Sequence, residues 1–367
     1  MLNPIEKPTL LLDKTKTERN IERMVARAAA SGVSFRPHFK THQSVDIGDW
    51  FRNRGVMKIT TSSVDMAAYF TAAGWQDILV AFPVNVRQSK AINKLAHEAA
   101  LHLVVESVAT AVTLNNFLST NVNVWLKVDA GSGRTGIHWQ DEELLADVAY
   151  TVADAPRLKL TGLLTHAGHT YRATSPEQIA AVYGETAVRL NQARDLLHAE
   201  GHNLLVSVGD TPACSIVDDF SRVDEIRPGN FVFYDLVQQR LGACLPDDIA
   251  VGVACPIVAK HEADYRIILY GGAVHLSRDS MVVNGETIYG RVARLTKEGW
   301  GQMLYGSKVV SLSQEHSILK TDPATFESLD VGDVLVVLPV HSCLTVDLYG
   351  RYTTLSGEVI TKMRTNE

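Results

Sequence analysis

Two residues near the end of the chain, His341 and Cys343, have metal-binding side chains and are separated by a single residue. They lie in the apolar run LPVHSCLTVDL, residues 338–348, and the hydrophobic pattern predicts a strand over DVLVVLPVHSC, residues 333–343. In an extended strand both side chains project from the same face, about 7 Å apart. Imidazole and thiolate bind zinc and similar ions, but a buried histidine beside a small buried thiol is an equally simple interpretation.

A second group of reactive side chains is centred on Lys40, which His38 and His42 flank. A lysine held in a pocket loses its proton more readily because of desolvation or neighbouring cations, and its amine can then attack a carbonyl carbon. A solvated loop lysine is the alternative interpretation of this residue.

The elements that must position these residues alternate between strands and helices. A short strand, PTLLLD, precedes an amphipathic helix, KTKTERNIERMVARAAASG. Eight further runs are predicted to be strands, at residues 33–39, 56–60, 77–82, 101–105, 122–129, 158–166, 203–209 and 230–235. Amphipathic stretches separate most of them. Eight strands alternating with helices predict a TIM-type (β/α)₈ barrel, and a doubly wound open sheet is the alternative.

Beyond about residue 245 the pattern changes to short strands joined by turns, with no clear helix between them. This pattern predicts a second, all-β domain at the carboxyl terminus. We therefore assign residues 14–244 to the barrel and residues 1–13 together with 245–367 to the β domain, which would contain His341 and Cys343.

Polar and glycine residues gather where the predicted barrel strands end, and the chemistry of such barrels lies at the carboxyl ends of their strands. The loops near strands seven and eight often bind phosphate. Here they offer Gly209, Thr211 and Gly229, with backbone N–H groups and one hydroxyl. A lysine able to form a Schiff base, together with a phosphate site, indicates pyridoxal 5'-phosphate (PLP) as the cofactor.

Four motifs make the whole chain resemble the fold-type III PLP enzymes, in which an alanine-racemase-like barrel precedes a C-terminal β domain. Within that class the chain is most similar to the group of D-threonine aldolase and D-serine dehydratase. The motifs are RPHFKTH (36–42), VDAGSGRTGI (128–137), GLLTHAGHTY (162–171) and RPGNFVFYD (227–235). Their order along the barrel makes the resemblance far more specific than any one motif.

The resemblance assigns roles to single positions in the first three motifs. It implies that Lys40 forms the Schiff base and that Arg134 lies near the cofactor ring. It also places His166 beside the ring and Tyr171 at the active site.

The fourth motif is similar to a segment that binds the phosphate and faces the pyridine nitrogen. Gly229 and Asn230 would donate backbone N–H groups to the phosphate, and Arg227 would face the nitrogen. A surface salt bridge from Arg227 to Asp224 or Glu225 is the alternative.

The resemblance also bears on His341-Ser342-Cys343. In this group a divalent metal ion lies near PLP, held by two side chains of the C-terminal domain. Aldolases tend to show His-x-Asp there, whereas D-serine dehydratases show His-x-Cys. The chain therefore resembles the dehydratases, with Zn²⁺ as the expected ion and Mn²⁺ or Mg²⁺ as alternatives. Few protein ligands leave positions open for substrate and water, as a catalytic ion requires.

The implied activity is that of a PLP- and metal-dependent lyase acting on a D-3-hydroxy amino acid, similar to D-serine dehydratase, which forms a 2-oxo acid and ammonia. One alternative is a D-threonine or 3-hydroxy-D-amino-acid aldolase, which would form glycine and an aldehyde. A racemase would need a second acid/base, for which Tyr270, Tyr289 and Tyr305 are available, but it would have no use for a metal pair. A PLP-binding protein without activity is the third alternative.

Composition limits the partners and the compartment. The net charge is −6 and no cluster of Lys and Arg suggests a nucleic-acid partner. No apolar stretch approaches the roughly 20 residues of a membrane span, and the amino terminus lacks a signal-type pattern. Four cysteines without a C-x-x-C pair favour reduced thiols in the cytoplasm. Fold-type III relatives lead us to expect a homodimer.

Overall fold

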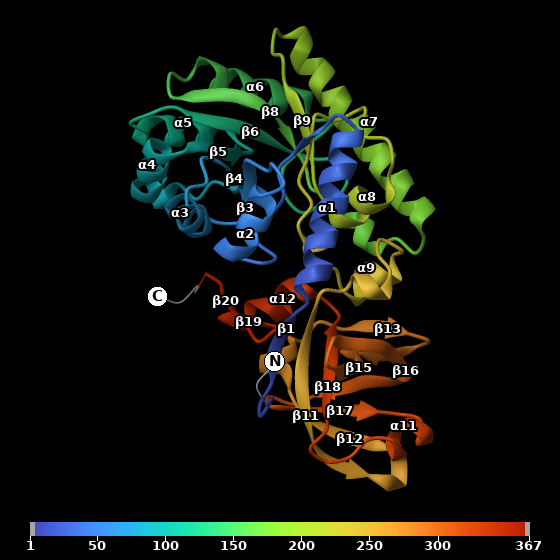
Figure 1. Cartoon of the computed structure of the whole chain (residues 1–367). Helices are drawn as coiled ribbons and strands as arrows, with labels where there is room; N and C mark the ends of the chain where they lie inside the picture. Colours follow the sequence, from blue (N-terminus) through green and yellow to red (C-terminus); the bar gives the residue numbers. More distant parts are fainter. Residues whose placement is uncertain (1–3, 364–367) are drawn as a thin grey trace. The chain divides into compact units, whose positions relative to one another are not determined.

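The computed structural model describes residues 4–363, which Figure 1 colours from the amino to the carboxyl terminus. The chain forms two compact units, Glu22–Gly229 and Met1–Ile21 with Asn230–Glu367. We refer to the first as the barrel unit and to the second as the β unit. The domain boundaries placed at residues 14 and 244 remain a prediction, and residues 1–3 and 364–367 of the predicted β domain lie outside the described residues.

The barrel unit is built on parallel strands that follow one another in chain order around a nearly closed sheet. These strands are β2 (Ser34–Phe35), β3 (Lys58–Thr61), β4 (Asp77–Pro83), β5 (Ala100–Val105), β6 (Val122–Asp129), β8 (Leu158–Leu164), β9 (Leu205–Val208) and β10 (Glu225–Ile226). The last strand, β10, pairs with the first, β2, and a bridge between His38 and Thr60 joins the first segment to β3. The predicted (β/α)₈ barrel is confirmed, because a doubly wound sheet would reverse its strand order.

Helices connect most of the barrel strands, and several begin at a serine whose hydroxyl accepts a backbone N–H of the first turn. Ser63, Ser107 and Ser175 cap their helices in this way. The helices of this part of the chain are α1 (Lys14–Ala30), α2 (Val45–Arg52), α3 (Val64–Ala72), α4 (Ser89–Glu98), α5 (Val108–Phe117), α6 (Glu142–Asp154), α7 (Pro176–Ala199) and α8 (Thr211–Ile216). A short strand, β7 (Ile137–His138), pairs with β6, and 3₁₀ helices form at Val86–Gln88 (η1) and Gly168–Arg172 (η2).

The eighth strand lies earlier in the chain than predicted. Residues 230–235 do not form a strand, because Asn230–Val232 form a 3₁₀ helix (η3). Phe231, Val232 and Phe233 are all fully buried, so the apolar run marks a buried turn. As a consequence, the segment from Arg227 to Asn230 follows the carboxyl end of β10, on the side of the barrel where chemistry is expected.

The β unit contains a second, mainly antiparallel sheet that includes the amino-terminal strand. Its strands are β1 (Thr9–Leu12), β11 (Val251–His261), β12 (Arg266–Tyr270), β15 (Gly290–Thr296), β16 (Gly299–Leu312), β17 (His316–Lys320), β18 (Val334–Pro339), β19 (Arg351–Thr354) and β20 (Val359–Thr361). Strand β12 pairs with both β17 and β11, so this sheet also closes on itself. A hairpin of β13 (Met281–Val283) and β14 (Glu286–Ile288) extends from it. The predicted C-terminal β domain is confirmed.

Short helices interrupt this sheet, contrary to the expectation of strands and turns alone. They are α9 (Leu236–Arg240), α10 (Ala273–Leu276), α11 (Pro323–Glu327) and α12 (Ser342–Asp347), with 3₁₀ helices at Pro246–Asp248 (η4) and Glu262–Asp264 (η5). The strand predicted through His341 and Cys343 is wrong, because β18 ends at Pro339 and α12 begins at Ser342. No helix between residues 4 and 363 is long and apolar enough to cross a membrane.

The barrel core explains a glycine in the middle of β8. Leu79, Val104, Trp125 and Leu164, from four strands, form a cluster with at most 1% of each side chain exposed. A Cβ on Gly162 would lie 2.7 Å from the Trp125 ring and would also meet the carbonyl oxygen of Leu205 on β9. Only glycine therefore lets β9 and the indole approach β8 this closely.

We predict that Gly162→Ala lowers the free energy of unfolding by about 1–3 kcal/mol, because the added methyl group overpacks the core. The matched control is Gly184→Ala in α7, where a Cβ would meet no atom within 4 Å. That substitution should raise stability by up to about 1 kcal/mol through helix propensity. Denaturant unfolding compares the two variants, and equal effects would contradict the packing argument.

Candidate active site

Lys40 follows a segment that a buried aromatic side chain holds in place. The Phe39 ring is fully buried, with its centroid 5.0 Å from those of Phe51 and Phe70 and 5.1 Å from that of Trp75. The Phe39 N–H donates to the carbonyl of Thr60 on β3 at 2.8 Å. The phenyl ring therefore packs into the protein, whereas the neighbouring Lys40 is exposed.

His166 lies near Lys40 and is held as a neutral imidazole. Burial, followed by the charge of Lys40, lowers the pKa of His166 to about 3. Its Nδ1 contacts the carbonyl oxygen of Gly209, so Nδ1 donates and Nε2 keeps its lone pair. The Tyr171 ring lies 6.3 Å from the His166 ring, centroid to centroid. Four predicted positions are thus brought together: Lys40, His166, Tyr171 and Gly209.

Three further cationic side chains lie in the same part of the barrel unit, and the sequence analysis identified only Arg134 and Arg227. The third, Lys127 on β6, is 4% exposed. Burial, then the charges of Arg227 and Arg134, lower the pKa of Lys127 to about 7. The signal that could have revealed it is the alternation of β6, in which Trp125, Lys127 and Asp129 share one face.

The loop after β6 wraps around the carboxylate of Asp129. Its Oδ1 accepts from the backbone N–H groups of Gly131 at 2.9 Å, Ser132 at 2.8 Å and Gly133 at 3.1 Å. This local network satisfies the carboxylate with backbone donors. The exposed Arg134 follows at the end of the turn, without a carboxylate partner among the described residues.

The glycines predicted to bind phosphate lie where two backbone segments approach each other. A Cβ on Gly209 would lie 2.8 Å from the carbonyl oxygen of Arg227, and a Cβ on Gly229 would lie 2.9 Å from that of His38. Within residues 4–363 the N–H groups of Gly229 and Asn230 donate to no protein acceptor. Donors of this kind, on backbone that no side chain shields, suit an anionic group such as phosphate.

Thr211, the other predicted phosphate residue, begins α8 and is buried. Asp210 caps this helix by accepting from the N–H of Ala213 at 2.8 Å and from Thr170 Oγ1 at 3.0 Å. Burial raises the pKa of Asp210 to about 6, although both donors lower it. The cap fixes the position of Thr211 beside Gly209.

Arg227 does not form the surface salt bridge considered as an alternative. It is only 4% exposed, and its Nε donates to Ser207 Oγ at 2.7 Å. Its Nη2 donates to the carbonyl of Thr165 at 2.5 Å and to that of Ser207 at 3.3 Å. The arginine is therefore an interior residue of the barrel unit, with no direct contact to Asp224 or Glu225 among these bonds.

In the β unit, His341 and Cys343 come together at the start of α12. Their side chains form a hydrogen bond, and His341 Nδ1 lies 3.5 Å from Asp279 Oδ2. Burial lowers the pKa of His341, but the hydrogen bonds to Asp279 and Cys343 outweigh it and raise the pKa to about 11. With Asp279 at Nδ1, the other ring nitrogen is oriented away from that carboxylate, an arrangement typical of metal-binding histidines.

The side chain of Asn230 supports this pair. Its Nδ2 donates to Asp235 Oδ2 at 2.7 Å, to Ser342 Oγ at 3.0 Å and to Cys343 Sγ at 3.5 Å. Asp235 also accepts from the Ser342 N–H at 3.0 Å, so the loop before Cys343 is held from two sides. In the described part of the chain no group of three or more His, Cys, Asp or Glu side chains could hold a metal ion.

Two known protein families match successive parts of this chain. The alanine racemase N-terminal domain matches residues 12–236. The putative serine dehydratase domain matches residues 250–355.

Three curated proteins are similar over almost the whole chain. A D-threo-3-hydroxyaspartate dehydratase from Delftia sp. (strain HT23) is 32% identical, over 96% of this chain and 95% of that enzyme. Its solved structure has a TM-score of 0.90 at 30% identity and covers 97% of both chains. A D-serine dehydratase from Dictyostelium discoideum is 27% identical, over 97% and 95%. A 3-hydroxy-D-aspartate aldolase from Paracoccus denitrificans (strain Pd 1222) is 26% identical, over 97% and 90%.

Lys127 gives a pH prediction for the protein without cofactor. Its pKa is about 7 in the folded chain and 10.5 when unperturbed, so between these values the unfolded chain binds more protons. The free energy of unfolding should therefore rise with pH across this window, by at most about 5 kcal/mol at 1.36 kcal/mol per pKa unit. Lys127→Met should flatten the rise. Denaturant unfolding from pH 7 to 10 measures it, and equal slopes for both proteins would contradict the assignment.

Proposed function

The chain belongs to the family that joins an alanine racemase N-terminal domain to a putative serine dehydratase domain, and we propose that it is a metal-dependent lyase of a D-3-hydroxy amino acid. The family is one of PLP enzymes and includes dehydratases and aldolases. We favour a reaction like that of D-serine dehydratase, which yields a 2-oxo acid and ammonia. The observation that carries this choice is the contact between the imidazole of His341 and the thiol of Cys343.

Residues of the barrel unit, together with Asn230 that directly follows it in the chain, fit PLP. Lys40 would bind the cofactor as a Schiff base, and the N–H groups of Gly229 and Asn230, with Thr211, would bind its phosphate. The support for these roles is the pair of unpartnered N–H groups and the close backbone approach at Gly229. When bound, PLP stabilises negative charge that develops at the substrate Cα.

The side chains around Lys40 would prepare the site for an amino acid. The freed amine of Lys40 is the base that we assign to the α-proton. Arg134, and Lys127 in its protonated form, add positive charge near it, which favours binding of a carboxylate. The neutral His166 contributes a flat ring without adding another charge. Tyr171 would complete this part of the site.

The residues of the β unit fit a divalent metal ion. His341 and Cys343 combine an imidazole with a thiol, a ligand pair that favours zinc over manganese or magnesium. The bound ion would act as a Lewis acid on the β-oxygen of the substrate. In solved variants of a D-threo-3-hydroxyaspartate dehydratase, a histidine and a cysteine two residues apart were each replaced by alanine, and the cysteine variant is in a metal-free form. His341 and Cys343 have the same spacing.

An aldolase is the second candidate, because an aldolase of 3-hydroxy-D-aspartate aligns along the same length of chain. The two reactions break different bonds of one substrate. A dehydratase releases the β-oxygen, whereas an aldolase cleaves the Cα–Cβ bond and leaves glycine and an aldehyde. Product analysis therefore distinguishes them.

We also propose a homodimer, as symmetric pairs are the commonest oligomers. Light scattering of the purified protein is the check, and a fully active monomer would refute it.

The Lys40 assignment predicts the outcome of borohydride reduction. The purified protein should absorb near roughly 420 nm as PLP aldimines do, and reduction should fix the cofactor on the peptide that contains Lys40. Peptide mass spectrometry locates the label. Lys40→Ala should lose the label without a loss of folding, because this side chain is exposed. A label on another lysine, or no chromophore after reconstitution, would refute the proposed site.

The metal assignment predicts what replacing Cys343 does. Cys343→Ala should lose the metal and the formation of 2-oxo acid while the PLP absorbance stays in place. Cys343→Asp should shift the preferred ion towards manganese, because a carboxylate is a harder ligand than a thiolate. Elemental analysis and assays of 2-oxo acid, ammonia and glycine measure these effects.

Cys244→Ala is the control for Cys343→Ala, since Cys244 is another half-buried thiol of the β unit. The Cys244→Ala protein should keep its metal. The proposed metal site is wrong if Cys343→Ala retains both its metal and its rate. Glycine instead of a 2-oxo acid from the unmodified protein would favour the aldolase.

A further inference from the structure

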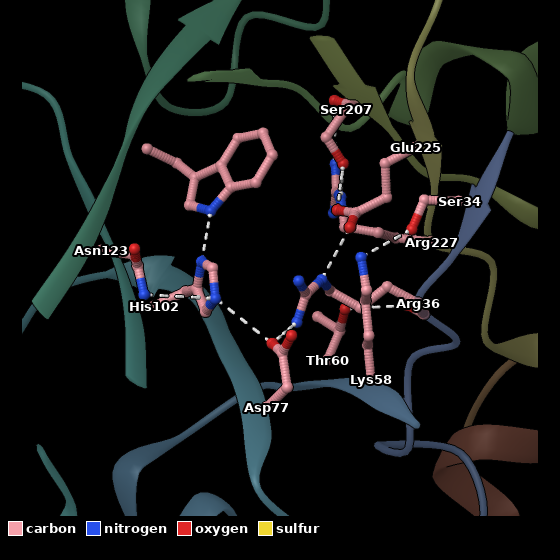
Figure 2. Close-up of polar contacts among 11 residues, drawn as sticks. Ser34, Arg36, Lys58, Thr60, Asp77, His102, Asn123, Ser207, Glu225 and Arg227 are labelled. Carbon is pink, nitrogen blue, oxygen red and sulfur yellow. Dashed lines mark hydrogen bonds and ion pairs between the residues drawn. The ribbon is translucent and has the colours of Figure 1, made fainter. Parts of the chain in front are cut away.

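A chain of polar contacts, buried except at Asp77, runs through the barrel unit from Arg227 to Asp77, as Figure 2 shows. Arg227 contacts Ser207, and Ser207 Oγ donates to Glu225 Oε1 at 2.8 Å. The other oxygen of Glu225 accepts from Arg36 Nε at 2.8 Å. Arg36 Nη1 then donates to Asp77 Oδ1 at 2.5 Å. Two arginines and two carboxylates thus alternate in charge.

The two ends of this chain of contacts differ in one respect. Arg36 pairs directly with its carboxylates, whereas the hydroxyl of Ser207 lies between Arg227 and Glu225. The hydroxyl accepts from Arg227 Nε at 2.7 Å and donates to Glu225, so it satisfies both groups at once. Ser207 is fully buried on β9, and no water is needed to complete the contact.

This arrangement fixes the direction of the guanidinium. Nε of Arg227 donates to the hydroxyl of Ser207, which lies on β9. Nη2 donates to the carbonyl of Thr165, which directly follows β8, and to that of Ser207. Nη1 donates to no acceptor in residues 4–363. The orientation of the guanidinium, and with it the direction of Nη1, is therefore set by hydrogen bonds to Ser207 and Thr165 and not by an ion pair.

We propose that Ser207 is a positioning residue that keeps Arg227 apart from Glu225 and so presents Nη1 to the cofactor ring nitrogen. This inference rests on the proposed PLP site. Without the hydroxyl, a desolvated guanidinium and a desolvated carboxylate would face each other across an unfilled gap. They would then close into a direct ion pair, as Arg36 and Glu225 already do, and Nη1 would withdraw.

The test compares Ser207→Ala with Glu225→Gln and with the double variant. Cofactor affinity is measured by titrating each apoprotein with PLP, and ¹⁵N-labelled PLP reports the environment of the ring nitrogen by NMR. Ser207→Ala should weaken PLP binding roughly ten-fold, the scale of one charged hydrogen bond, and move the ¹⁵N shift towards that of a nitrogen without a donor. Because Glu225 also pairs with Arg36, circular dichroism first establishes that the variants with Glu225→Gln are folded. Adding Glu225→Gln to Ser207→Ala should then restore much of the affinity and the shift, because the attraction that displaces Arg227 is gone.

A control variant separates positioning from general loss of stability. Thr17→Val removes another buried hydroxyl, which donates to the carbonyl of Asp13 at 2.8 Å, and should change neither the affinity nor the ¹⁵N shift. The inference is overturned if the ¹⁵N shift of the Ser207→Ala variant equals that of the unmodified protein. It is also overturned if adding Glu225→Gln to Ser207→Ala weakens PLP binding further, by the same factor as Glu225→Gln alone. If the unmodified apoprotein binds no PLP, the proposed function itself fails. If the unmodified apoprotein binds PLP and Ser207→Ala changes neither the affinity nor the ¹⁵N shift, only the positioning role of Ser207 is rejected.

Discussion

The barrel unit depends on one buried guanidinium, that of Arg36, which joins the segment after β2 to the first residues of β4 and β10. Its side chain is 3% exposed, and that of its partner Glu225 is 4% exposed. An unpaired charge at such a place typically costs about 3–5 kcal/mol, so the partners must be held together. Burial raises the pKa of the Asp77 carboxyl, but the His102 and Arg36 contacts outweigh it and lower the pKa to about 2. Asp77 therefore keeps its negative charge over the usual pH range.

The opposite end of the barrel has a different charge balance. Near Arg36 every buried charge has a partner of opposite sign, and His102 completes the network by accepting from Trp125 Nε1 at 3.0 Å. Near His166 lie the basic side chains of Lys40, Lys127 and Arg134, and the carboxylate of Asp129 is already satisfied by backbone donors. Basic side chains of this kind suit an anionic cofactor and a substrate carboxylate.

Features of the fold that depend on hydrophobic periodicity and on the order of the motifs could be predicted from the sequence. The bounds of β6 were predicted as residues 122–129, and the barrel followed from the alternation of elements. Strand β10 was missed because Glu225–Ile226 is too short to show a period, while the apolar run after it resembles a strand. The helix at Ser342–Asp347 was missed for a related reason, since the apolar run of β18 continues through residues 338–348 of the sequence without a clear break.

Contacts between distant residues could not be predicted from local pattern. Arg36 and Glu225 are 189 positions apart, and Arg36 and Asp77 are 41 apart, so neither pair leaves a local signal. Lys127 was overlooked within a correctly predicted strand, because one lysine in an apolar run is ordinary until its neighbours are known. The same holds for Ser207, whose role depends on the two groups that it separates.

The measurement that tests the account most directly is a crystal structure of the PLP-loaded protein with anomalous diffraction collected at the absorption edge of its metal. The account predicts continuous density from Lys40 Nζ to the cofactor and a single strong anomalous peak within bonding distance of a ring nitrogen of His341 and of Cys343 Sγ. An unmodified Lys40 in a crystal that contains bound PLP, or a peak that neither His341 nor Cys343 contacts, would contradict it.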